Sequence, residues 1–139
     1  MADQQAVELL QKVPIFADLD RRDLEQIAGS MKARTFSSGQ EIAREGQSGV
    51  GFFVIKEGNA KVSVAGEERR RLGPGDYFGE VALIADSART ATVTAETDLT
   101  CLGMTSWDFR PLVEGNASIA WKLLQAVAKT YGKAETEHH

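Results

Sequence analysis

A short stretch of the chain, residues 75–93, holds the residue types that could bind an anion. Gly79 leaves the backbone free to approach a ligand closely. Arg89 lies within residues 87–93, a run that is otherwise small and uncharged, and we expect it to lie on a strand. The fork of N–H donors of a guanidinium matches planar anions such as carboxylate and phosphate. The segment therefore predicts an anion site around Arg89.

The residues between Gly79 and Arg89 indicate how the backbone would contribute. Val81-Ala82-Leu83-Ile84 is about one helical turn long, and the free N–H groups of such a turn would point toward whatever precedes Glu80. Glu80 itself could accept hydrogen bonds from ligand hydroxyls, as carboxylates do with ribose. An internal salt bridge between Arg89 and Glu80, with no ligand, explains the same residues equally well. Because a buried ion pair is often no net gain in stability, we slightly favour the ligand role.

The part of the chain that must position these residues, residues 35–104, is rich in glycine and in short strand-like segments. It holds ten of the 13 glycines, namely Gly39, Gly46, Gly49, Gly51, Gly58, Gly66, Gly73, Gly75, Gly79 and Gly103. The segments 52–55, 61–64 and 90–94 are rich in β-branched and aromatic residues, and the last two alternate polar with apolar residues. Short strands with turn signals at intervals of about eight residues predict a β-sandwich or a barrel-like roll.

Helical spacing of apolar residues precedes this zone, in residues 1–34. The first apolar pattern runs to Val13, and Pro14 ends it. A second short helix begins at Asp20, which suits the N-cap, with Leu19 and Leu24 at the two positions of a hydrophobic staple. Two short helices are therefore predicted before the first strand.

Residues 105–137 are helical again. We predict a short helix over residues 107–113 and a longer one after the break at Gly115, capped by Asn116 or Ser118. The apolar stripe of the longer helix recurs at spacings of three and four residues: Ala120, Leu124, Val127 and Tyr131. The predicted fold is thus mainly β with flanking helices, in a single domain that covers residues 1–139.

The bulk composition excludes several classes of protein. With 42% hydrophobic and 26% charged residues, the chain of 139 residues is ordinary for a globular domain. Its formal charge of −4 argues against a nucleic-acid partner, and its one cationic run, residues 69–71, follows two glutamates as in a solvated hairpin. No apolar run approaches the ~20 residues of a membrane span, and no signal peptide opens the chain, so we expect a cytoplasmic protein without a membrane partner.

The cysteine and histidine content excludes the common metal and redox sites. Cys101 is the only cysteine and is predicted to be a buried core thiol. His138 and His139 are the only histidines, and their terminal position is typical of a purification tag. Cupin-type metal enzymes need a histidine cluster, haem sensors a histidine ligand, and iron–sulfur sensors several cysteines. We therefore expect no catalytic residue, no metal and no cofactor.

Two motifs together, Phe78 to Ile84 and, after a four-residue spacer, Arg89 to Val93, resemble the phosphate-binding cassette of cyclic nucleotide-binding domains. Residues 36–46 resemble the first strands of this family, and residues 53–58 its hydrophobic strand followed by glycine. The similarity covers nearly the whole chain and is of the kind shared by the catabolite activator protein and protein kinase regulatory subunits. It implies a β-roll, that is a double-stranded β-helix or jelly roll, at 35–104, with the cassette at 78–91 and lid helices at 105–137.

The resemblance also implies roles for individual residues. Arg89 would pair with the cyclic phosphate, Glu80 would hold the ribose 2′-hydroxyl, and Thr90 would lie near the phosphate and the base. The implied cyclic nucleotide site comprises Phe78, Gly79, Glu80, Val81, Ala82, Ala88, Arg89, Thr90 and Ala91. In relatives the terminal helix folds over the base, so three residues here are implied to face the purine: Tyr131, Lys133 and Glu135.

Two positions bear on affinity and on the choice of base. Ala88 departs from the family pattern, which has proline before the arginine, and the missing ring should loosen the loop by about 1 kcal/mol or less. The hydroxyl of Thr90 could meet the guanine 2-amino group, yet other members with this threonine prefer cAMP. We therefore favour cAMP over cGMP as the ligand.

These features predict a sensor that passes its signal through the C-terminal helix and is not an enzyme. Relatives that regulate transcription add a helix-turn-helix after the last long helix, where this chain ends. We expect either a stand-alone protein, with a homodimer as one form, or a module fused to an effector such as a channel, kinase, transferase or regulator. Two alternatives stay open: a terminal helix that merely closes the fold, and a ligand-free module of the same fold used for dimerisation or docking.

Overall fold

The computed structural model describes residues 4–47, 51–85 and 89–137, with the backbone alone from residue 131 onward. Contacts divide the chain into two compact units, Met31–Trp107 and a second unit formed by Met1–Ser30 together with Asp108–His139. The single domain over residues 1–139 stays a prediction, because two compact units can belong to one domain.

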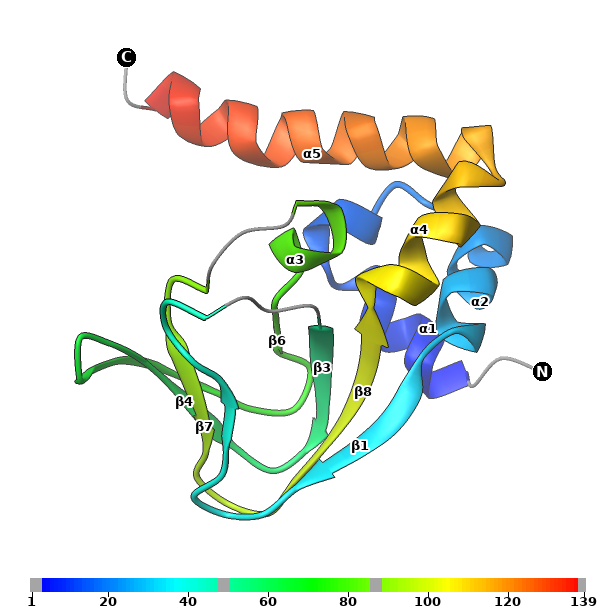
Figure 1. The fold of residues 1–139 in the computed structure, drawn as a ribbon. Helices are drawn as coiled ribbons and strands as arrows, with labels where there is room; N and C mark the ends of the chain where they lie inside the picture. The colour runs from blue at the N-terminus through cyan, green and yellow to red at the C-terminus, as the bar shows by residue number, and fades with distance from the viewer. Residues whose placement is uncertain (1–3, 48–50, 86–88, 138–139) are drawn as a thin grey trace. The chain divides into compact units, whose positions relative to one another are not determined.

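Unit Met31–Trp107 is built of two antiparallel sheets (Figure 1). The first sheet has the order β1-β8-β3-β6, with β1 at Lys32–Phe36, β8 at Leu99–Thr105, β3 at Gly51–Glu57 and β6 at Tyr77–Phe78. The second has the order β2-β7-β4-β5, with β2 at Glu41–Ala43, β7 at Thr92–Ala95, β4 at Ala60–Val64 and β5 at Glu67–Leu72. The predicted β-roll is confirmed, and its strands lie within three residues of the predicted zone at each end.

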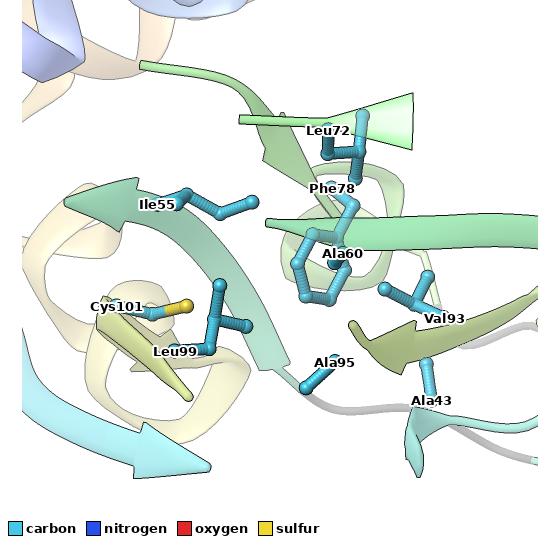
Figure 2. Close-up of a cluster of buried hydrophobic side chains, with 9 residues drawn as sticks. All are labelled: Ala43, Ile55, Ala60, Leu72, Phe78, Val93, Ala95, Leu99 and Cys101. Atoms are coloured by element: carbon cyan, nitrogen blue, oxygen red, sulfur yellow. The ribbon is translucent and has the colours of Figure 1, made fainter. Parts of the chain in front are cut away.

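The core of this unit lies between the two sheets. Figure 2 shows a cluster of nine buried side chains there, which are Ala43, Ile55, Ala60, Leu72, Phe78, Val93, Ala95, Leu99 and Cys101. Four of them come from the first sheet and five from the second, because alternate residues of each strand point to one face. The predicted burial of Cys101 is confirmed, since its side chain is fully shielded from solvent.

The hairpin that carries the cationic run is exposed, as predicted. All of β5 except Leu72 is exposed. Arg71 forms ion pairs with Glu68 at 3.0 Å and with Glu96 at 3.5 Å, and Arg69 forms one with Glu67 at 3.5 Å. Neighbouring acidic side chains therefore partly neutralise the run.

The second unit is helical, with α1 at Gln4–Gln11, η1 at Pro14–Phe16, α2 at Arg21–Gly29, α5 at Ala117–Glu137 and most of α4, at Ser106–Glu114. Two predicted caps are confirmed. Asp20 Oδ1 accepts the N–H of Asp23 at 2.9 Å, and Asn116 Oδ1 accepts the N–H of Ile119 at 3.1 Å. None of the described helices combines the length and the apolar character needed to cross a membrane.

The predicted apolar stripe of α5 does not coincide with the side chains that are buried. Among the side chains described for this helix, those of Ile119, Leu123 and Ala126 are buried, whereas in the predicted stripe Ala120 and Val127 are half-buried and Leu124 is 59% exposed. Both sets of residues recur at spacings of three and four, because this helix is apolar on more than one side, and sequence spacing alone does not distinguish them.

Candidate ligand-binding site

Gly79 provides a place where only a glycine fits. It follows β6 with a φ of +87°, a backbone conformation that side chains with a Cβ rarely adopt. A Cβ at this position would lie 2.3 Å from the carbonyl oxygen of Gly51 and 2.6 Å from Nη1 of Arg89. The absence of a side chain therefore lets the Arg89 guanidinium lie directly against the backbone of residue 79.

The guanidinium of Arg89 is partly buried and incompletely paired. Its Nη2 donates a hydrogen bond to the carbonyl oxygen of Gly51 at 2.6 Å. Its Nε is fully buried and has no partner within the described part of the chain. A buried N–H without an acceptor costs about 1–3 kcal/mol. This arrangement therefore suits an acceptor supplied from outside the chain.

The charge of this group also responds to its surroundings. Burial lowers the pKa of the Arg89 guanidinium below its usual value, and the nearby Glu80 carboxylate opposes that shift. An arginine retains its proton at neutral pH in either case. The site therefore presents a partly desolvated cation, in which an anion is held more strongly than at an open surface.

Arg89 does not lie on a strand, and this prediction was wrong. It precedes β7 and pairs with the turn after β2: its carbonyl oxygen accepts the N–H of Gly46 at 2.8 Å, and its own N–H donates to the carbonyl oxygen of Gln47 at 2.9 Å. Two backbone hydrogen bonds therefore fix the residue without extending the ladder of β7.

Glu80 lies at the start of α3, which spans Val81–Ile84, the four residues predicted to form a helical turn. Its backbone is in the right-handed helical region, with a φ of −62°, and its side chain makes no capping hydrogen bond. No salt bridge joins Glu80 to Arg89, although the structure describes both side chains. The internal ion pair is therefore not formed within 4 Å, and no described residue forms a salt bridge with the Glu80 carboxylate.

The helix itself contributes one buried and two exposed apolar side chains. Leu83 is buried, whereas Val81 is 45% exposed and Ile84 is 56% exposed. The N–H of Ala82 donates to the carbonyl oxygen of Gly79 at 3.0 Å. A ligand bound to the amide of Ala82 would thus share or replace this bond.

The remaining predicted residues are distributed differently. Phe78 belongs to the core, Thr90 is exposed, and Ala91 is half-buried. Ala88 lies outside the described residues. The structure therefore brings together Gly79, Glu80 and Arg89. It shows no comparable contact with Arg89 for the other described residues of the predicted set.

The three candidate purine-facing residues fall in the last part of α5. Tyr131, Lys133 and Glu135 belong to that helix by backbone, and their side chains lie outside the described residues. Their facing a base stays a prediction.

Sequence reasoning missed three residues that hold the arginine: Gly46, Gln47 and Gly51. Each contributes a backbone atom, and a backbone atom has no residue-type signature beyond the glycines that permit close approach. The clustering of glycines at positions 46, 49 and 51 was the only available signal.

The other features of the described surface do not point to a second ligand site. A hollow of about 490 Å³ is lined by Asn59, Arg71, Leu72, Gly73, Glu96 and Thr97, and none of the predicted site residues lines it. Among the described residues, no group of three or more His, Cys, Asp and Glu side chains could hold a metal ion.

Comparison with known proteins gives a consistent picture. Residues 33–116 match the family model described as the cyclic nucleotide-binding domain. The chain is 40% identical over 81% of its length to a cyclic nucleotide-gated potassium channel of Mesorhizobium japonicum, of which it spans 31%. It is 38% identical over 70% of its length to a cGMP-dependent protein kinase of Toxoplasma gondii, of which it spans 10%. The chain thus matches only a minor part of these curated relatives.

Two solved structures are similar in fold and in sequence. The N-terminal domain of a transcriptional regulator from Streptomyces coelicolor has a TM-score of 0.86 and 29% identity, over 94% of this chain and 95% of that one. The cAMP-bound structure of PfPKA-R has a TM-score of 0.70 and 28% identity, over 96% of this chain and 46% of that one.

Proposed function

Since the chain belongs to the cyclic nucleotide-binding domain family, we propose that Arg89 holds the cyclic phosphate of the ligand and that Glu80 holds its ribose. The observation that carries this proposal is the buried Nε of Arg89, which has no hydrogen-bond partner among the described residues and lies beside a glycine that exposes the backbone. A phosphate oxygen supplies the missing acceptor. The charge-assisted hydrogen bond so formed is about twice as strong as a neutral one.

The other two residues of the central set complete the binding mode. Gly79 lets the cyclic phosphate approach the backbone, because no Cβ stands between the ligand and Arg89. The Glu80 carboxylate lies at the start of α3 and makes no capping hydrogen bond there, and such a group accepts hydrogen bonds from a ribose 2′-hydroxyl. Three neighbouring groups then read the phosphate and the sugar, the parts that cAMP and cGMP share.

The base is read by other groups, and cAMP is the proposed ligand. A solved relative that is similar over most of this chain carries cAMP, whereas a related kinase is named for its dependence on cGMP. Thr90 is exposed and offers a hydroxyl that could meet the guanine 2-amino group. Binding of cGMP with lower affinity is therefore part of the proposal.

The chain acts as a regulatory module, with no catalytic activity of its own and no cofactor. Two relatives it matches are longer proteins, a cyclic nucleotide-gated potassium channel and a cGMP-dependent protein kinase. We assign the output to α5, the longest helix, which passes the signal to a fused or partner effector. The chain is proposed to act in the cytoplasm, where cyclic nucleotides are formed.

Titration calorimetry with cAMP, cGMP and 5′-AMP tests the proposal directly. We expect binding of both cyclic nucleotides, with cAMP the tighter, and no binding of 5′-AMP, whose open phosphate carries a second charge and a different shape. At a ligand concentration of 100 times Kd, binding raises the free energy of unfolding by about 2.7 kcal/mol, and a thermal-shift measurement detects this increase. A folded protein that binds neither cyclic nucleotide would instead be the ligand-free docking or dimerisation module.

A further inference from the structure

A tight turn beside the site holds the backbone of Arg89. In residues 44–47 the N–H of Gln47 donates to the carbonyl oxygen of Arg44 at 3.1 Å, and Gly46 has a φ of +83°. This is the geometry of a turn that needs a glycine at its third position. The two hydrogen bonds that fix Arg89 both come from this turn, through Gly46 and Gln47. Any motion of the turn therefore moves the arginine.

The side chain of Glu45 ties this turn to a hairpin elsewhere in the fold. Its Oε1 accepts the N–H of Ala65 at 2.9 Å, and its own N–H donates to Thr92 Oγ1 at 3.1 Å. Ala65 lies 20 residues further along the chain, in the loop between β4 and β5. One residue thus joins the turn, the hairpin and the start of β7.

The hairpin offers this N–H because of its own geometry. Val64 pairs with Glu67, so Ala65 and Gly66 form a two-residue loop, and their φ values are +53° and +81°. Positive φ at both residues is typical of the type I′ turn, which matches the twist of antiparallel strands. The bond that closes such a turn uses the N–H of its fourth residue, so the N–H of Ala65 is left for another acceptor.

We propose that Glu45 is a positioning residue for nucleotide binding, which acts through the backbone of Arg89. This inference rests on the proposed role of Arg89 in holding the phosphate. The N–H of Ala65 in the β4–β5 hairpin anchors the Glu45 carboxylate, the carboxylate steadies the 44–47 turn, and the turn holds the backbone of Arg89 in place. Without that anchor, binding must order the turn as well as the ligand, which lowers affinity.

Three variants separate this role from a general effect of charge. Glu45→Ala removes the acceptor for Ala65. Glu45→Gln keeps an Oε1 acceptor and loses only the charge. Glu41→Ala is the matched control, because Glu41 is exposed near the same turn and pairs with Arg44 at 2.8 Å, and among the described residues it forms no hydrogen bond or ion pair with Ala65 or Arg89.

Amide hydrogen exchange of the nucleotide-free protein, followed by NMR, tests the clamp without any ligand. In Glu45→Ala the amides of Gly46 and Arg89 should exchange about fivefold faster, the factor for one hydrogen bond of ordinary strength. Glu45→Gln and Glu41→Ala should exchange like the wild type. Unchanged exchange in Glu45→Ala, or equal acceleration in Glu41→Ala, overturns the proposal.

Affinity for cAMP then tests the link to binding. Glu45→Ala should bind cAMP about fivefold more weakly than the wild type. Glu45→Gln should bind cAMP with an affinity close to that of the wild type. In an Arg89→Lys background the effect of Glu45→Ala should shrink, since both changes act on one contact. If the losses of binding free energy caused by Glu45→Ala and Arg89→Lys are fully additive, the proposal that Glu45 acts through Arg89 is overturned. If the wild type binds no nucleotide, the proposed function fails, whereas the exchange measurement still decides whether Glu45 clamps the turn.

Discussion

Arg89 donates a 2.6 Å hydrogen bond from Nη2 to the carbonyl oxygen of Gly51, which lies 38 residues earlier in the chain. This hydrogen bond engages Nη2 with the protein backbone and fixes the orientation of the guanidinium. The buried Nε is left without an acceptor in the described residues. The arginine is therefore oriented before any ligand arrives, and less conformational entropy is lost on binding.

Replacing the anchor should abolish tight binding. Arg89→Ala is expected to weaken cAMP binding by at least about 2–3 kcal/mol, because a charge-assisted pair in a partly desolvated site is lost. Calorimetry on Arg89→Ala measures the loss, and Arg69→Ala, which removes an exposed arginine of the β5 hairpin, is the control. Wild-type affinity in Arg89→Ala would rule out the phosphate assignment.

The second polar anchor should be specific for the sugar. Glu80→Gln is expected to weaken binding of cAMP and to have almost no effect on binding of 2′-deoxy-cAMP, which lacks the hydroxyl in question. The comparison is a double-mutant cycle between one side chain and one ligand group. An equal loss with both ligands would make Glu80 a structural residue.

A pair of glycine substitutions separates backbone strain from steric conflict. Gly79→Ala and Gly39→Ala both place a Cβ on a backbone with φ near +90°, at a cost of about 1–2 kcal/mol. A Cβ at Gly39 meets no atom within 4 Å, whereas one at Gly79 would lie 2.6 Å from Arg89 Nη1. Urea unfolding should show a larger loss of stability for Gly79→Ala, and only this variant should lose affinity for cAMP.

The thiol of Cys101 should be inert in the folded protein. Burial raises its pKa from 9.0 to about 11, so the fold favours the neutral thiol. The stability that the neutral thiol confers is fully present below pH 9.0 and is lost as the pH rises through about 11. The stability advantage of the wild type over Cys101→Ala in urea unfolding should therefore shrink over that range. Alkylation at pH 8 should need unfolding, and fast alkylation of the native protein would contradict the buried position.

The terminal helix is expected to respond to the ligand. Saturating cAMP should slow amide exchange across Leu124 to Glu135 more than anywhere outside the cassette, if this helix closes over the base. Truncation after Thr130 should then weaken binding by about 0.5–1.5 kcal/mol through lost stacking of Tyr131. Truncation after Glu135 is the control. Unchanged exchange together with unchanged affinity would make α5 a simple closing helix.

The sequence by itself determines the elements whose signals are local. The four residues of α3, the cap Asp20 and the strand-rich zone between the helices all follow from residue types and their spacing, and Asn116 is one of the two caps that the sequence allows for the long helix. Each depends on hydrogen bonds or side-chain spacing within a few neighbouring residues, so the signal lies in adjacent positions. Arg89 is likewise noticeable as a lone charge in a small, uncharged run.

The tertiary structure decided what depends on partners far apart in the chain. The register of the strands brings the carbonyl oxygen of Gly51 to Arg89 and makes the 44–47 turn, rather than a strand, hold the arginine. Helix packing buries Ile119 rather than Leu124. Backbone carbonyls and N–H groups occur in every residue type, so the sequence carries no mark of which ones meet. The packing of residues tens of positions apart makes that choice.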